Sequence, residues 1–213
     1  MSKNSSEQER QARHAPITNL ANGLTSVRLL LAPALGWALT QQLWWLGSLT
    51  IAIAVVTDVY DGRIARRHQY TSPFGGLFDH GTDAFFVSVG AWALATHGLV
   101  NPWLWPCIAL AFLQYALDSN ALAGRHLRTS ILGRYNGVAY YALVATAVGS
   151  QAVGGSTQVL ATEHPDMQAW LARGLVLLDR AVFWVAWLLV VSTVASMADR
   201  LCHSLMGSRQ QSS

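Results

Sequence analysis

DVYDGRIARRHQYTSPFGGLFDHGTD, residues 58–83, places four aspartates in one short segment of a chain that has only 11 acidic residues. Apolar sequence flanks this segment on both sides, with WWLGSLTIAIAVVT before it and AFFVSVGAWALAT after it. An aspartate at the centre of a membrane helix costs roughly 2.5–3.5 kcal/mol on insertion scales. Such acids need cations or water to compensate their charge, and they usually mark a functional site.

The composition indicates an integral membrane protein. Of the 213 residues, 52% are hydrophobic and 12% are charged, whereas soluble domains have about 25% charged residues. No internal repeat is evident, and the length suits one domain. We expect a membrane domain over residues 17–203, between a polar N-terminal tail (1–16) without the apolar core of a signal peptide and a polar C-terminal tail (204–213).

Six apolar segments are long enough to span a membrane, which takes about 20 residues each. They cover approximately residues 22–41, 43–66, 73–97, 101–123, 135–153 and 180–201. The fold expected is therefore an all-α bundle of six transmembrane helices. GSQAVGGSTQVLATEHPDMQ, between the last two segments, is typical of a loop. Residues 166–180 are amphipathic, so they either lie along the membrane interface or extend the sixth helix.

Basic residues predict the orientation. With six spans both termini share one side, which would hold twelve of the 14 basic residues. These are Lys3, Arg10, Arg13, Arg28, Arg63, Arg66, Arg67, Arg125, Arg128, Arg134, Arg200 and Arg209. Only Arg173 and Arg180 fall toward the other side, and an excess of Lys and Arg marks the cytoplasmic side. We expect both termini and the acidic site to face the cytoplasm, in a bacterial inner membrane.

The spacing of the aspartates predicts that they converge. Asp58 and Asp61 are three residues apart and Asp79 and Asp83 are four apart, so each pair shares one helix face. A polar turn would join the two helices in antiparallel directions, which brings all four carboxylates into one layer below the cytoplasmic interface. His80 projects about 100° around the helix from Asp79, so we expect it to pack, or to support the metal ligands, without binding the metal itself.

Clustered carboxylates without support from histidine or cysteine are typical of sites for Mg²⁺ or Mn²⁺. Two ions fit the pattern, because the metals of two-metal sites lie about 3.5–4 Å apart and share carboxylates. The alternative is that the acids line a solvated vestibule or pair with arginines. Gly62, Gly75 and Gly76 would leave room for a ligand beside the metals, or would let the helices pack closely.

Eight residues of this segment resemble the signature of the CDP-alcohol phosphotransferases. They follow the pattern D-x-x-D-G-x-x-A-R, eight residues, G-x-x-x-D-x-x-x-D, and are Asp58, Asp61, Gly62, Ala65, Arg66, Gly75, Asp79 and Asp83. Upstream, Asn22, Thr25 and Arg28 resemble the N-x-x-T-x-x-R opening of phosphatidylglycerophosphate-synthase-like members. The resemblance spans most of residues 20–200.

The resemblance implies an enzyme that moves a substituted phosphate from a CDP-linked lipid or alcohol to a hydroxyl and releases CMP. It implies two divalent cations on Asp58, Asp61 and Asp79, with Asp83 as both a ligand and the general base. It also implies residues that bind the CDP-lipid, namely Asn22, Thr25, Gly62, Ala65, Arg66 and Gly75. Related members are commonly homodimers.

Basic residues after the aspartate segment bear on the acceptor. Arg125, Arg128 and Arg134 follow the fourth apolar segment, and Arg28 adds a fourth cation. Individually they satisfy the positive-inside pattern. Together they would hold an anionic acceptor such as glycerol 3-phosphate. The stretch S-x-x-G-R that ends at Arg134 resembles the serine-glycine-lysine stretch of phosphatidylglycerophosphate and cardiolipin synthases, with arginine for lysine and Gly137 where threonine is usual.

We therefore expect a phosphatidyltransferase that uses CDP-diacylglycerol and a small alcohol or lipid acceptor, with glycerol 3-phosphate favoured and no nucleic-acid partner. The same chemistry with phosphatidylglycerol, inositol phosphate or an amino alcohol is an alternative. A metal-ion or proton-coupled transporter would need acids through the whole membrane, and we expect no matching acid in the other half. A catalytically silent membrane scaffold is a third alternative.

Overall fold

The computed structural model describes residues 23, 25–68, 73–118, 131–157 and 164–210, without the side chains of residues 61, 64–68, 73–74, 118, 131 and 203–210. In these residues the regular structure is six helices and no strand. The first helix covers residues 25–40. It is followed by α2 (Trp44–His68), α3 (Pro73–Thr96), α4 (Leu104–Asp118), α5 (Ile131–Thr157) and α6 (Pro165–Gln210). The predicted all-α class is confirmed.

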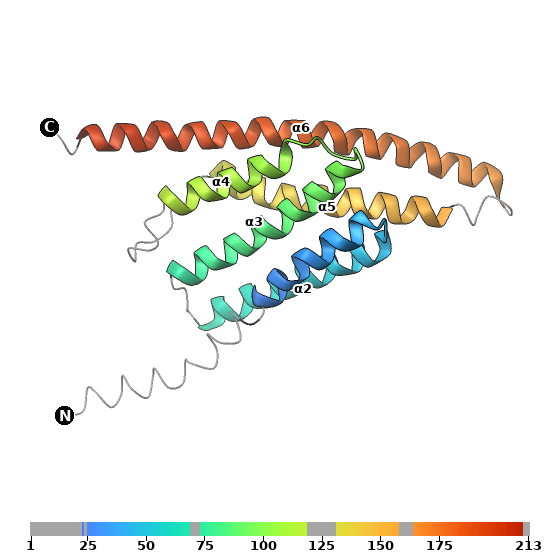
Figure 1. Ribbon diagram of the computed structural model, residues 1–213, viewed down its shortest axis with the longest axis horizontal. Helices are drawn as coiled ribbons and strands as arrows, with labels where there is room; N and C mark the ends of the chain where they lie inside the picture. The colour runs from blue at the N-terminus through green and yellow to red at the C-terminus, as the bar shows by residue number, and fades with distance from the viewer. Residues whose placement is uncertain (1–22, 24, 69–72, 119–130, 158–163, 211–213) are drawn as a thin grey trace, which may run out of the picture.

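The helices form one elongated bundle (Figure 1). α5 packs against α2, α3 and α6, and α4 packs against α3 and α6. α6 runs along the whole bundle, and its 46 residues correspond to about 69 Å at 1.5 Å per residue. The start of the first helix, the end of α2, the start of α3, the end of α4 and the end of α6 lie at the same end of the bundle (Figure 1). We call this the acidic end, because the aspartates of α2 and α3 lie toward it.

Two tight turns at the opposite end hold neighbouring helices side by side. After α3, Gly98 has a φ of 71° and the Leu99 N–H donates to the Leu94 carbonyl at 3.1 Å. This hydrogen bond satisfies a carbonyl of the last helical turn, and glycine adopts the left-handed conformation without strain. After the first helix, Gln42 takes the same role with a φ of 58°. The two turns make antiparallel pairs of the first helix with α2 and of α3 with α4.

Small residues bring the helices close together around one apolar core. A β-carbon at Gly90 would lie 2.9 Å from the Val144 Cγ1, so α3 approaches α5 too closely for a larger side chain. A β-carbon at Gly47 would lie 2.6 Å from the Leu39 Cδ2. The largest fully buried apolar side chains are Leu35, Leu39, Phe86, Leu94, Val100, Leu104, Val144 and Val148. This core fixes the relative positions of the helices that carry the aspartates.

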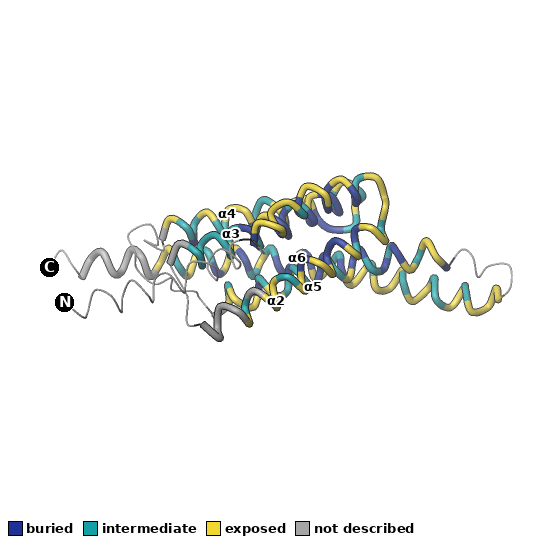
Figure 2. Tube along the Cα trace, turned by 90° about the horizontal axis from the view of Figure 1, so that it is seen from below, coloured by how far each residue is buried: buried dark blue, intermediate teal, exposed yellow. Residues whose placement is uncertain are grey.

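Exposed residues line the helices of the bundle (Figure 2), and many of them are large and apolar. Exposed side chains include Leu30, Leu49, Leu110, Trp184, Leu188 and Val191. A helix bundle that is apolar inside and outside is suited to a lipid environment. By length and composition, one helix in the described residues qualifies as a candidate membrane span, within Pro165–Cys202. Trp44–Tyr60 and Leu104–Leu117 are shorter apolar helical stretches.

Helix boundaries differ from the sequence prediction mainly in α5 and α6. Residues 149–157 belong to α5, although their Gly and Ser content indicated a loop. Residues 166–180 belong to α6, which resolves the alternative left open above, and α6 continues to Gln210 into the segment expected to be a polar tail. The carboxylate of Asp179 on α6 accepts hydrogen bonds from the Ser150 Oγ at 2.5 Å and the Gln151 Nε2 at 3.0 Å. These contacts pair the helices and override the low helix propensity of the segment.

Candidate active site

Three aspartates of the sequence motif converge on one buried arginine. Arg28 lies on the first helix with a side chain that is 0% exposed. Its Nη1 donates to the Asp58 Oδ1 on α2 at 2.9 Å and to the Asp83 Oδ1 on α3. Its Nη2 donates to the Asp79 Oδ1 on α3. Two neighbouring helices thus contribute carboxylates to one cluster, as their helical spacing predicted, and the first helix contributes the cation.

Exposure increases from one side of this cluster to the other. The side chains of Asp83, Asp79 and Asp58 are 26%, 36% and 50% exposed, whereas Arg28 is fully enclosed. The arginine therefore lies beneath the carboxylates, and the carboxylates form the accessible surface of the cluster. Burying the guanidinium without these partners would be strongly unfavourable, because a buried charge needs both an opposite charge and hydrogen bonds.

Asp79, His80 and Asp83 form a group that could hold a metal ion. One ligand atom from each of the three side chains lies within 4.8 Å of the others. His80 also packs edge-on against Tyr115, with ring centroids 5.8 Å apart. The sequence predicted that His80 packs or supports the ligands without binding the metal. Its ring nitrogen lies within 4.8 Å of a carboxylate oxygen of Asp79 and of Asp83, which makes it a candidate ligand as well. Carboxylate oxygens suit Mg²⁺ and Mn²⁺, and an imidazole is a common additional ligand for transition metals.

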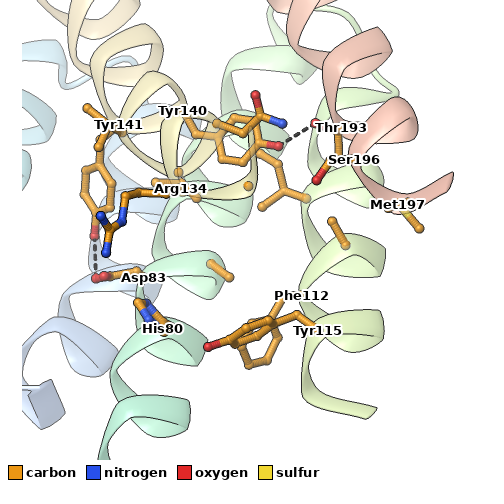
Figure 3. A pocket seen from close by; sticks show the side chains of 18 of the residues that line it. His80, Asp83, Phe112, Tyr115, Arg134, Tyr140, Tyr141, Thr193, Ser196 and Met197 are labelled. Atoms are coloured by element: carbon orange, nitrogen blue, oxygen red, sulfur yellow. Dashed lines mark hydrogen bonds between the residues drawn. The ribbon is translucent and has the colours of Figure 1, made fainter. Parts of the chain in front are cut away.

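Tyr141 on α5 completes the surroundings of Asp83. Its hydroxyl donates to the Asp83 Oδ1 at 3.0 Å (Figure 3). Its ring stacks on Phe86, with centroids 5.7 Å apart and an angle of 14° between the planes. Phe86 is fully buried and lies three residues after Asp83 on α3. Tyr141 was not among the site residues predicted from the sequence. A tyrosine in an apolar helix was the available signal, because a buried hydroxyl needs a hydrogen-bond partner.

A cavity of about 550 Å³ opens beside these carboxylates. Helices α3 to α6 supply most of its lining, and Asp58 and Asp83 border it. The polar residues that face it from the other helices include Arg134, Asn136, Tyr140, Ser196 and Arg200. Arg134 was predicted as an acceptor ligand. Arg200 was seen in the sequence only as part of the charge pattern, and its guanidinium carbon lies 5.4 Å from the centre of the Tyr115 ring.

Hydrogen bonds between helices support the far wall of this cavity. The Tyr140 hydroxyl pairs with the Thr193 hydroxyl (Figure 3), and the Ser192 Oγ donates to the Asn136 Oδ1 at 2.7 Å. Each pair joins α5 to α6. Hydrogen-bonded helices therefore form this wall of the cavity, and a precise binding site needs rigid support of this kind.

Other predicted residues take varied positions. Thr25 is buried on the first helix, one turn before Arg28. Gly62, toward the end of α2, and Gly75, at the start of α3, are half-buried. Asn22 and Arg125 lie outside the described residues, as do the side chains of Asp61, Ala65 and Arg66. Arg28 lies under the carboxylates, whereas Arg134 lines the cavity.

One expectation about the far half of the bundle is wrong. Asp179 is an acidic residue there, although no acid was expected. Ser150, its partner, lies nine residues beyond Tyr141 along α5, a distance of about 13 Å. The Asp179 carboxylate fastens α6 to the end of α5 and is separate from the cluster around Arg28.

The architecture defines a class of protein: a helical bundle with carboxylates from two antiparallel helices, gathered at one end beside a cavity with basic residues. The family model for CDP-alcohol phosphatidyltransferase matches residues 18–195, which include this cluster. The chain belongs to this family.

Similar proteins carry names with different alcohols or products. A CDP-diacylglycerol–glycerol-3-phosphate 3-phosphatidyltransferase of Cereibacter sphaeroides is 32% identical over 40% of this chain and 41% of its own length. A probable CMP-forming cardiolipin synthase of Drosophila melanogaster is 34% identical over 41% of this chain and 28% of its own length. Cholinephosphotransferase 1 of Gallus gallus is 33% identical over 45% of this chain and 30% of its own length. The matches thus span less than half of each relative, and no solved structure matches significantly.

Proposed function

We propose that this chain is a membrane enzyme that transfers the phosphatidyl group of CDP-diacylglycerol to the hydroxyl of an alcohol and releases CMP. The observation that supports this most directly is the complete aspartate signature, with Asp58, Asp79 and Asp83 gathered beside a cavity in a member of this family. Glycerol 3-phosphate is the acceptor we favour. Two relatives that bear the glycerol-3-phosphate phosphatidyltransferase name, from Cereibacter sphaeroides and Rickettsia felis, are in line with this choice.

The metal ligands we propose are Asp58, Asp61, Asp79 and Asp83, which would hold two divalent cations, Mg²⁺ or Mn²⁺. The donor set fits, because it is rich in carboxylate oxygens and three of its members already share one cation, the Arg28 guanidinium. Bound divalent cations would neutralise the diphosphate of the donor and the CMP that leaves. Arg28 would then share or yield part of its contacts with the carboxylates.

Asp83 is the general base in this proposal. Its carboxylate borders the cavity, so an acceptor in the cavity can approach it. Its side chain is also the least exposed of the three aspartates. In the reaction the acceptor oxygen bonds to the phosphorus of the phosphatidyl group while the bond from that phosphorus to the CMP oxygen breaks. The acceptor hydroxyl proton passes to Asp83. The CDP-lipid would lie against Asn22, Thr25, Gly62, Ala65, Arg66 and Gly75.

An anionic acceptor fits the other side of the cavity. Arg134 from α5 and Arg200 from α6 both line it, so two helices each supply a guanidinium suited to a phosphate. Arg125 would add to this charge. Arg28 is fully buried beneath the aspartates, so we assign its charge to them and not to the acceptor.

An assay of CMP release with purified protein tests this proposal. CDP-diacylglycerol would be supplied in mixed micelles with Mg²⁺, Mn²⁺ or a chelator, together with one acceptor at a time. We expect metal-dependent CMP release with glycerol 3-phosphate. Release only with phosphatidylglycerol, inositol phosphate or an amino alcohol would overturn the acceptor assignment alone. An absence of CMP release with every acceptor would overturn the proposal that the chain is an enzyme of this kind.

We also propose six membrane spans with both termini and the acidic end in the cytoplasm of a bacterial cell, and a homodimer. The arginines near the acidic end, among them Arg63, Arg134 and Arg200, support this orientation by the positive-inside rule. Single cysteines at Ala169 and Ser208, in a chain with Cys107 and Cys202 replaced by serine, should react differently with an impermeant maleimide. In intact spheroplasts only the cysteine at position 169 should be labelled. Light scattering of the purified protein tests the dimer.

A further inference from the structure

We propose that Tyr141 is a positioning residue that holds the Asp83 carboxylate in the orientation needed to accept the proton of the acceptor hydroxyl. This inference rests on the proposed function. Tyr141 lies outside the aspartate signature, 58 positions after Asp83, on a helix that carries none of the signature residues. Its hydroxyl nevertheless donates to the Asp83 Oδ1 at 3.0 Å, which is normal hydrogen-bond geometry.

The position of the Tyr141 hydroxyl is itself fixed. Its ring lies nearly parallel to the ring of Phe86, at an angle of 14°, and Phe86 is fully enclosed in the core. Tyrosine has two side-chain torsions before the ring, so stacking of the ring determines where the hydroxyl lies. Phe86 and Asp83 are three residues apart on one face of α3. The same short segment therefore carries the carboxylate and the support for the residue that holds it.

The two hydrogen bonds to Asp83 in the described residues are both made to Oδ1, one from Tyr141 and one from Arg28. The two donors differ in what a bound cation would do to them. Arg28 is positively charged and is shared with Asp58 and Asp79, so a cation competes with it for the carboxylates. Tyr141 is neutral, and Asp83 is the carboxylate that it contacts. Tyr141 can therefore keep its contact when the cation site is filled.

In this arrangement the two carboxylate oxygens of Asp83 have different roles. Oδ1 is anchored by Tyr141, which restricts rotation of the carboxylate about its bond to Cβ. The second oxygen is then presented in a narrow range of directions, next to the cavity that Asp83 and Tyr141 both line. A base within a fixed orientation accelerates proton transfer more than one that rotates freely, because misplacement by about 1 Å can cost a large factor in rate.

Tyr141→Phe tests the inference, because it removes the hydroxyl and keeps the ring against Phe86. Wild-type CMP release is measured first, with the acceptor that supports it. We expect kcat of Tyr141→Phe to fall about tenfold to a hundredfold, the effect of losing a hydrogen bond to a charged group. The KM values for CDP-diacylglycerol and for the acceptor should stay within about twofold, since the hydroxyl acts on the reacting geometry. Tyr135→Phe, on the same helix but 69% exposed and outside the cavity lining, is the matched control and should keep wild-type kinetics.

Several outcomes would overturn the positioning role while leaving the enzyme intact. An unchanged kcat in an active protein is one, and a rise in KM without a fall in kcat is another. A rate restored by raising Mg²⁺ or Mn²⁺ would show that the hydroxyl serves metal binding. A Tyr141→Phe protein that does not fold, judged by its thermal unfolding in detergent, would show that the hydroxyl is structural. If the wild type itself releases no CMP with any acceptor, the proposed function fails and this inference fails with it.

Discussion

Arg28 and Asp58 are 30 positions apart in the chain, yet the Nη1 of Arg28 lies 2.9 Å from the Oδ1 of Asp58. The same guanidinium pairs with Asp79 and Asp83 and has no exposed side-chain surface. The first helix therefore contributes directly to the acidic end of the bundle. A single buried cation holds carboxylates of two helices together, and its removal should have consequences for both folding and metal binding.

Replacing Arg28 by Gln should destabilise the protein when no divalent cation is present. Breaking a buried ion pair from one side costs about 3–5 kcal/mol, and we expect about 2–3 kcal/mol here because the carboxylates keep contact with solvent. The midpoint of thermal unfolding in detergent, with a chelator present, measures this. Arg173→Gln, at the exposed opposite end, is the control and should change stability by less than about 0.5 kcal/mol.

Mn²⁺ or Mg²⁺ should stabilise Arg28→Gln more than it stabilises the wild type. Without the guanidinium the three carboxylates repel one another, and a bound cation relieves this repulsion. The rise in unfolding temperature on adding the metal should therefore be larger in the variant. An equal or smaller rise would contradict a cation site on the carboxylates that Arg28 contacts.

Asp83→Asn should largely abolish turnover and leave CDP-diacylglycerol binding measurable, because an amide cannot take the acceptor proton. Asp61→Asn should instead weaken the metal-dependent binding of the nucleotide. Equilibrium binding of the CDP-lipid, measured beside the rate of CMP release, separates the two effects. Near-normal turnover in Asp83→Asn would show that Asp83 is not the base.

Arg134→Gln and Arg200→Gln should each impair use of an anionic acceptor. Both side chains line the cavity beside Asp83, and a hydrogen bond to a charged group is worth about 1.5–3 kcal/mol. We expect kcat/KM for glycerol 3-phosphate to fall by about tenfold to a hundredfold, with the KM for CDP-diacylglycerol within about twofold. A KM change confined to CDP-diacylglycerol would place the donor, and not the acceptor, against these arginines.

Asp179→Leu should lower stability without changing the rate per folded enzyme. The change leaves the buried Ser150 hydroxyl without its carboxylate partner, and we expect a loss of about 1–3 kcal/mol. Thermal unfolding and CMP release, measured on the same preparation, test this. A specific loss of turnover would mean that the far end of α5 and α6 takes part in the reaction.

The convergence of the aspartates was predictable, because their spacing along the sequence shows which of them share a helix face. Asp79 and Asp83 are one turn apart, and an antiparallel partner helix brings Asp58 to the same level. The roles of Arg28 and Tyr141 were not predictable in this way. Their contacts with Asp83 join different helices, and the choice of contact depends on packing, such as the stack of Tyr141 on Phe86.

The lengths of α5 and α6 were also not predictable from local sequence, because they too depend on contacts between helices. Gly, Ser and Thr indicated a loop after residue 148, since these residues favour turns. In the fold, the carboxylate of Asp179 bonds to Ser150 and Gln151, and this tertiary contact keeps the segment helical. Local propensity could not show it, because the partner lies 29 positions away.

We propose that the aspartates around Arg28 act with divalent cations in the transfer of a phosphatidyl group. The most direct test is CMP release from CDP-diacylglycerol by purified wild type and Asp83→Asn, with glycerol 3-phosphate present or omitted and with Mn²⁺, Mg²⁺ or a chelator. We expect release by the wild type that requires both metal and acceptor, and almost none by Asp83→Asn. Release that persists in the chelator, or at equal rates in the two proteins, would contradict it.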